Sequence, residues 1–233
     1  MSKAPSLADR LNKARACSTP EVGDRARRGL LAYLGAQSDA ARAAADLADG
    51  TAATGIGRVA LSGLAPKGLA CTDGCAFCCI LSGEDGGTIT EAEAVALHEA
   101  LAPLAGQPDG RAWHPKACPS LDPNTRSCRA YAARPMICRA YVSTDVEACK
   151  SVSEGQSAQG PGTLGPYHTY LAAIGLSRAA LKGTKRVSTY ALSRVAAAAV
   201  EGASLDEALA ASRHKPTELD AELKRSKRDL LRT

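Results

Sequence analysis

The stretch Cys71-Thr72-Asp73-Gly74-Cys75-Ala76-Phe77-Cys78-Cys79 places four thiols within nine residues. Thiolates are the soft, charged ligands that zinc and iron-sulfur clusters select, and two or three residues between ligands let one short loop wrap a single centre. The spacing C-x3-C-x2-C-C therefore predicts a metal site at residues 71–79.

Two other interpretations of these four cysteines need no metal. Their positions recur at i, i+4, i+7 and i+8, which would place them on one face of a helix, where free cysteine packs as a small hydrophobe. A stripe made only of cysteine is an odd choice, however, because Leu, Ile and Val pack equally well. A set of disulfides would need an oxidising compartment. The N-terminus is basic but lacks the apolar region of a secretory signal, so we expect a reduced, cytoplasmic protein.

The composition of the 233 residues predicts a mainly α protein, because Ala and Leu are abundant and there are only one Phe, one Trp and six Tyr. No apolar run approaches the length of about 20 residues that spans a bilayer, so we expect no membrane association. The net charge of +5 is modest for this length and does not by itself indicate nucleic acid.

The cysteine distribution suggests three parts. Residues 1–70 form an N-terminal helical segment and linker, residues 71–150 an irregular cysteine-cluster metal-binding module, and residues 151–233 a linker and C-terminal helical segment. Apolar periodicity predicts one or two helices over residues 5–48, whereas the Gly-rich residues 50–70 favour a linker or short strand. Capping boxes at Thr90–Glu93 and Ser204–Glu207 predict two helix starts. We expect the terminal helices to hold the cysteine module between them.

A second group of thiols follows at intervals of about ten residues, at Cys118, Cys128, Cys138 and Cys149. Such intervals suit ligands that separate turns bring together in space. Pro119 and Pro135 restrict the neighbouring backbone and stop helices, as is usual for ligand loops. The charge of a thiolate-bound centre needs compensation, and four basic residues lie within one to four positions of these cysteines: Arg129, Arg134, Arg139 and Lys150. We expect Arg134, which precedes a proline, to be structural to the site.

Together these motifs resemble a known family. Cys-x3-Cys-x2-Cys-Cys is followed by Cys-Pro-x-Leu-Asp, then by Cys-x2-Tyr-x2-Arg-Pro-x2-Cys-Arg-x-Tyr and a last Cys. This order is similar to the YkgJ-type cysteine-cluster family of zinc- or iron-chelating CxxxCxxCC proteins. The resemblance implies eight ligands: Cys71, Cys75, Cys78, Cys79, Cys118, Cys128, Cys138 and Cys149. Ala132 stands where many members carry an acidic residue, and the first gap is one residue longer than in others, which could alter the thiols that share a centre.

Eight thiols exceed what one tetrahedral ion takes. The candidates are two closed zinc sites, one 4Fe-4S cluster plus a zinc, or one cluster with the remaining cysteines in another role. Adjacent Cys78 and Cys79 point in different directions on most backbones, so we expect them to serve different centres, or one of them to be spare. Cys17 stands apart from the other eight and is not expected to be a ligand, and His114 is the histidine nearest to the cysteines in sequence.

The sequence shows no nucleophile–base pair, paired carboxylates or phosphate loop, so it indicates a metal site without a reaction and leaves open whether the protein is an enzyme. The first hypothesis is a metal-binding protein whose metal closes the fold, is stored, or is passed to a protein partner. The second is an iron-sulfur enzyme, because similar clusters occur in flagellin lysine methylases and Cys71-x3-Cys75-x-Phe77-Cys78 resembles the radical S-adenosylmethionine signature. The strand–helix repeats of a partial TIM barrel do not follow that signature. The third is a thiol redox sensor that uses Cys78 and Cys79.

Overall fold

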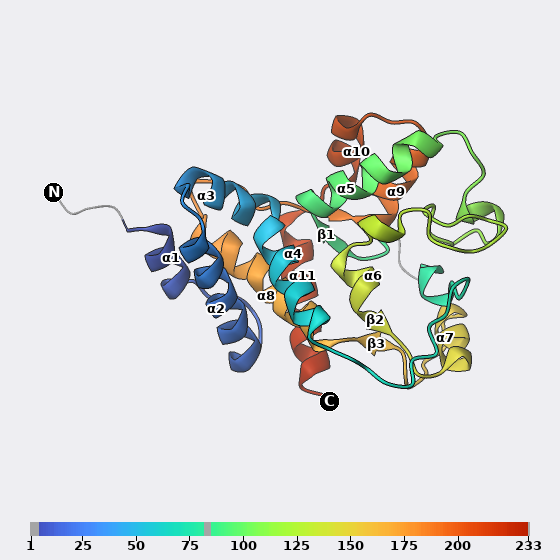
Figure 1. Cartoon of the computed structure of the whole chain (residues 1–233), viewed down its shortest axis with the longest axis horizontal. Coiled ribbons are helices and arrows are strands. Elements are labelled where there is room, and N and C mark those ends of the chain that lie inside the picture. The colour runs from blue at the N-terminus through green and yellow to red at the C-terminus, as the bar shows by residue number, and fades with distance from the viewer. Residues whose placement is uncertain (1–4, 82–84, 233) are drawn as a thin grey trace. The chain divides into compact units, whose positions relative to one another are not determined.

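The computed structural model describes residues 5–81 and 85–232, whose path is shown in Figure 1. These residues form eleven α-helices and four strands of two or three residues, so the protein is mainly α, as its composition predicts. The chain divides into two compact units. Unit 1 takes its described residues from Met1–Gly63, Gly165–Thr189 and His214–Thr233, and unit 2 from Leu64–Leu164 and Tyr190–Arg213.

Unit 1 is a helical unit organised around one buried helix, α8 (Gly165–Ala180). Every residue from Pro166 to Ser177 is buried, as expected for a helix that is covered on all sides. The helices that pack against α8 are α1 (Leu7–Lys13), α2 (Pro20–Ala36), α3 (Ala40–Asp49), α4 (Thr51–Ser62) and α11 (Pro216–Leu230). His168 Nδ1 lies 2.8 Å from Ser226 Oγ and Tyr167 donates to Glu222 at 3.1 Å, so polar contacts also join α8 to α11.

Two expectations for the N-terminal segment were wrong. Residues 5–48 form three helices instead of one or two, and most of the expected linker at 50–70 is helix α4. The small residues that favour a linker are instead the ones that let α4 pack closely, because Ala52, Ala53 and Gly57 are buried. A Cβ at Gly29 on α2 would lie 3.1 Å from the side chain of Ile56, so glycine there makes room for α4.

Unit 2 contains α5 (Glu91–Leu101), α9 (Leu192–Val200) and α10 (Leu205–Ser212), which pack against one another and lie side by side in Figure 1. Strand β1 (Thr88–Thr90) pairs with β4 (Thr189–Ala191), and β2 (Tyr141–Val142) pairs antiparallel with β3 (Gly162–Thr163). The short helices α6 (Met136–Ala140) and α7 (Val146–Ser153) complete the unit. Its apolar core includes Ile89, Leu97, Leu101, Tyr190 and Val195.

Both capping boxes form as predicted. The Thr90 hydroxyl accepts from the Glu93 N–H at 3.3 Å, and the Glu93 carboxylate accepts from the Thr90 N–H at 3.1 Å. The corresponding distances at Ser204 and Glu207 are 3.4 and 2.9 Å. These contacts start α5 and α10 at the positions that the sequence predicts, because each box satisfies two otherwise unpaired backbone N–H groups.

The two units do not follow the order of the three segments expected from the sequence. Helices α9 and α10 come from the C-terminal segment, yet they pack on α5 and belong to the unit that holds residues 64–164. The apolar faces of α5 and α9 must be covered, and packing them together buries both. None of the helices in the described residues combines the length and apolar character needed to cross a membrane.

Candidate metal centre

The loop that carries the first four cysteines is not a helix, so the interpretation as a one-sided cysteine stripe is wrong. Within residues 71–79 only Phe77–Cys79 forms a helical turn, the 3-10 turn η1. Gly74 has φ +74°, and a Cβ there would lie 3.2 Å from the Thr125 carbonyl oxygen, so the turn requires glycine. The Asp73 carboxylate accepts from the Ser127 hydroxyl at 2.8 Å and fixes this turn against the segment before Cys128.

Backbone hydrogen bonds bring Cys118 and Cys128 to this loop. The Cys118 N–H donates to the Cys79 carbonyl at 2.7 Å, and Ile80 forms an antiparallel bridge with Ala117. A second bridge joins Leu121 to Cys128. The chain therefore doubles back between residues 121 and 128, so that Cys128 returns toward the segment that holds Cys118.

Cys138 lies in α6, whose first turn is held by a residue from α5. The N–H of Met136 donates to Glu93 Oε1 at 2.8 Å, while Glu93 Oε2 serves the capping box at Thr90. Glu93 is 3% exposed, so this carboxylate joins two helix N-termini inside the unit. The Cys138 N–H bonds to the Pro135 carbonyl at 3.0 Å. The capping box identified Glu93 in the sequence, but its contact with α6 spans 43 residues and could not be predicted.

Cys149 lies in α7, whose N-terminus is capped by the Asp145 carboxylate. Two residues earlier, the Ser143 carbonyl accepts from the Ala70 N–H at 2.9 Å and lies 3.8 Å from Cys71 Sγ. Helix α7 also packs against η1. Cys71 and Cys149 therefore approach each other around Ser143. Cys79, the last residue of η1, pairs instead with the segment that holds Cys118.

The thiols influence one another electrostatically. Burial raises the pKa of Cys118 and Cys128, and it raises the pKa of Cys138 well above its usual value, with further upward contributions from neighbouring thiolates. Burial and the thiolates of Cys75 and Cys71 raise the pKa of Cys149. Cys78 Sγ lies 4.0 Å from Cys79 Sγ, and this contact lowers the pKa of Cys78 to about 7 and raises that of Cys79.

Arg134 is the basic residue most closely associated with the thiols. Its positive charge lowers the pKa values of Cys78, Cys128 and Cys138, against the larger effect of burial at the last two. Its guanidinium lies 3.6 Å from the centroid of the Tyr131 ring, a cation–π contact. This arrangement agrees with the expected role of Arg134 in charge compensation.

The other basic residues differ in role. Arg129 also lowers the pKa of Cys128 and donates to the carbonyls of Pro108 and Pro119. Arg139 donates to the Arg134 carbonyl at 2.6 Å, so it holds the backbone that carries Arg134. Lys150 is exposed on α7. Of these basic residues, Arg134 and Arg129 are the ones whose charges lower thiol pKa values; that they compensate a metal centre stays a prediction.

The histidine side chains have partners other than thiols. His98 Nε2 lies 2.9 Å from the Ala203 carbonyl oxygen, and His114 Nδ1 accepts from the Lys116 N–H at 3.1 Å. His168 contacts Ser226, and His214 Nδ1 lies 3.3 Å from the Thr189 hydroxyl. These contacts give each ring a structural role.

All nine cysteines are free thiols, so the interpretation as a set of disulfides is also wrong. The donor set fits a thiolate-bound metal chemically, because soft, unpaired sulfur ligands with basic neighbours are what zinc and iron-sulfur centres use. As the side chains stand, no group of three or more His, Cys, Asp or Glu among residues 5–81 and 85–232 has the geometry to hold a metal ion. Binding would therefore require the sulfur atoms to draw together.

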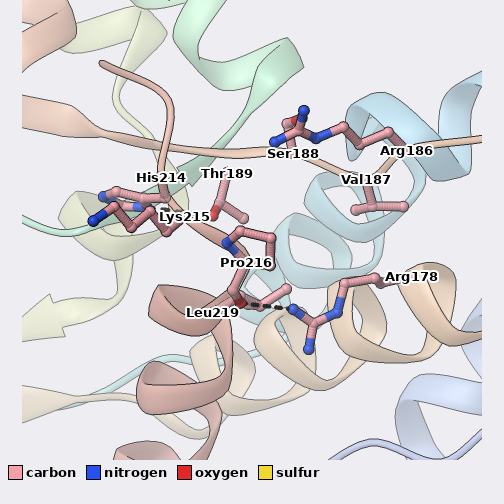
Figure 2. Close-up of a pocket in the computed structure, with 9 residues that line it drawn as sticks. All are labelled: Arg178, Arg186, Val187, Ser188, Thr189, His214, Lys215, Pro216 and Leu219. Carbon is pink, nitrogen blue, oxygen red and sulfur yellow. Dashed lines mark hydrogen bonds between the residues drawn. The ribbon is translucent and has the colours of Figure 1, made fainter. Parts of the chain in front are cut away.

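A small cavity in unit 1 has a different chemistry. Figure 2 shows its lining, which contains no cysteine: Arg178, Arg186, Val187, Ser188, Thr189, His214, Lys215, Pro216 and Leu219. Arg178 donates to the Pro216 carbonyl at 3.0 Å and pairs with Asp220. The cavity is therefore polar and basic, and its cations make it unsuited to bind a metal ion.

Searches of curated proteins and of solved structures found no match to this chain. A family model does match, over residues 70–156, which include the eight cysteines of unit 2 and exclude Cys17. That family is CxxCxxCC, described as a "putative zinc- or iron-chelating domain", and the match over this segment agrees with the resemblance that its cysteine pattern indicated.

Proposed function

We propose that this protein binds zinc, or iron as a 4Fe-4S cluster, through eight thiolates: Cys71, Cys75, Cys78, Cys79, Cys118, Cys128, Cys138 and Cys149. The observation that carries the proposal is that these eight thiols, and not Cys17, lie in one compact unit, all free. Burial and neighbouring thiolates raise the pKa of Cys138 well above its usual value, so its deprotonated form is unfavourable without a nearby positive charge. A metal removes that penalty because it binds the deprotonated form.

The bound metal would act mainly on the fold of unit 2. Between Leu64 and Thr88, and again between Gln107 and Pro135, the described backbone has only 3-10 turns and isolated bridges. Segments with so little regular secondary structure gain most from a cross-link. A metal that closes this part of the fold is therefore the simplest role. Free thiols also suit a reduced compartment such as the cytoplasm. That the terminal helices enclose this module stays a prediction.

Anaerobic purification followed by metal and acid-labile sulfide analysis tests the proposal. Stoichiometric zinc without colour supports a structural zinc module. A brown protein with iron and sulfide supports a cluster, and it keeps open an enzyme related to protein lysine methylases or radical S-adenosylmethionine proteins. A metal-free protein whose thiols cycle with peroxide contradicts metal binding and favours the redox sensor.

Replacing Arg134 is expected to weaken metal binding. Arg134→Ala removes the positive charge that lowers the pKa values of Cys78, Cys128 and Cys138, so the thiolate forms that bind metal become less favourable. We expect affinity to fall by about 10- to 100-fold, the usual effect of losing a group that supports metal ligands. Competition against a chelator of known affinity measures the change.

Lys150→Ala is the matched control, because Lys150 is also basic and adjacent to a cysteine but is exposed on α7. The metal affinity of this variant should stay within about 2-fold of that of the unchanged protein, since charges in water are screened. Equal losses in the two variants would contradict a specific role for Arg134.

A further inference from the structure

We infer that the eight thiols form two adjacent four-thiol centres and that the boundary between them falls between Cys78 and Cys79. This inference rests on the proposed function. One group, the core thiols, consists of Cys79, Cys118, Cys128 and Cys138. The other, the outer thiols, consists of Cys71, Cys75, Cys78 and Cys149.

The core thiols share one apolar environment. Cys118 is part of the hydrophobic core that α5 and α9 form, and Cys79, Cys128 and Cys138 pack against that same core. Of the described cysteines, the other five are not in it. The Cys118 N–H bond to the Cys79 carbonyl and the bridge from Leu121 to Cys128 tie three of the four core thiols together through the backbone. Helix α6, whose first turn is held by Glu93, carries the fourth core thiol, Cys138.

The outer thiols gather around Ser143 and the start of α7. The Ser143 carbonyl contacts Cys71 Sγ and accepts from Ala70, and α7, which carries Cys149, packs against η1. Cys71 and Cys78 are exposed and Cys75 is half-buried, whereas Cys149 is buried. Two of the four outer thiols therefore reach solvent, whereas none of the four core thiols is exposed.

The turn η1 explains how neighbouring residues reach different centres. A 3-10 turn has three residues per turn, so consecutive side chains leave it in directions about 120° apart. Cys78 is exposed, while Cys79 packs on the apolar core. Their sulfur atoms are 4.0 Å apart, so the two centres would lie next to each other.

Each of the two groups also has the number of thiols that one metal centre needs. Four thiolates complete a tetrahedral zinc site, and four likewise anchor a 4Fe-4S cluster. Each group then carries a net charge of about −2 in either case.

Site-resolved thiol labelling tests this division on the full-length protein. The protein, purified anaerobically with its metal, is treated with rising concentrations of EDTA and pulsed with N-ethylmaleimide, and each cysteine is quantified by mass spectrometry. We expect Cys71, Cys75, Cys78 and Cys149 to become labelled together at a lower EDTA concentration, because their centre is nearer to solvent. The four core thiols should follow together at a higher one.

Labelling of Cys78 and Cys79 in the same step, or of all eight thiols in one step, would overturn the division. The proposed function fails in a different way: if the protein carries no metal, the accessible thiols react without EDTA and EDTA changes nothing. Cys17 provides an internal reference, because it is exposed and should react throughout.

Single variants give a second measurement. Cys149→Ser should lose the outer centre and retain protection of the four core thiols, whereas Cys138→Ser should lose the core centre and leave the outer thiols protected. Cys17→Ser should change neither. Loss of protection at all eight thiols in Cys149→Ser, with native circular dichroism retained, would contradict two separable centres.

Discussion

Removing the metal under reducing conditions is expected to unfold the cysteine segment of unit 2 while the helices of unit 1 stay folded. Residues 64–81, 85–87 and 107–135 are held by turns and isolated bridges, so they have little regular secondary structure of their own. In small structural zinc sites the apparent binding free energy reaches about 10–16 kcal/mol, and this energy is folding free energy. Unit 1 instead has the buried helix α8, which does not depend on thiols.

Hydrogen exchange read by mass spectrometry, before and after chelation with a reductant present, measures this effect. Amides near Cys118 and Cys128 should exchange at least about 100-fold faster without metal, because their protection follows the free energy of local opening. Amides of α8 serve as the control and should keep their protection. Unchanged exchange at residues 117–130 would show that the segment folds without metal.

Glu93→Ala is expected to destabilise unit 2 more than any other single change in a helix cap. The substitution removes the capping box of α5 and also leaves the Met136 N–H, buried at the start of α6, without its acceptor. Loss of the box costs about 0.5–2 kcal/mol, and an unsatisfied buried donor costs about 1–3 kcal/mol. The sum of about 1.5–5 kcal/mol should appear as a lower midpoint in urea denaturation.

Glu207→Ala is the matched control, because Glu207 occupies the same position in the capping box of α10 but is exposed. It should cost only about 1 kcal/mol, the contribution of the box alone. Glu93→Gln should recover only part of the lost stability, since its single amide oxygen can accept from the Met136 N–H or from the Thr90 N–H but not from both, and its NH2 group then faces the other N–H. Equal costs for the two alanine variants would show that the contact between Glu93 and Met136 contributes nothing.

The sequence predicts helices best where a local signal marks their start. The Thr90 and Ser204 capping boxes gave the first residues of α5 and α10 because a capping box involves only four consecutive residues. The sequence did not predict α4, because its Gly55 and Gly57 disfavour a helix in isolation. Packing of α4 against α2, α3 and α8 outweighs that cost, and this packing comes from residues far away in the sequence.

For the site, spacing and residue type single out eight of the nine cysteines as candidate ligands, and all eight fall in unit 2; that they bind metal stays a prediction. They also pointed to Arg134, whose charge acts on three thiols. The spacing could not assign the thiols to groups, because that depends on the apolar core that residues 190–213 complete. The sequence also could not predict that Glu93 joins α5 to α6, because this contact too is made between residues far apart in the sequence.

The interleaving of the two units bears on the order in which the protein can mature during synthesis. Cys149 is made 64 residues before Arg213, the last residue of unit 2. At about 5–20 residues per second, the ribosome needs roughly 3–13 s to cover that distance. Throughout this interval all eight thiols exist in the nascent chain, while the helices that cover the apolar side of Cys118 are still being made. The sulfur atoms beside that core therefore acquire their native surroundings last, and a growing chain is most open to oxidation or to the wrong ion during those seconds.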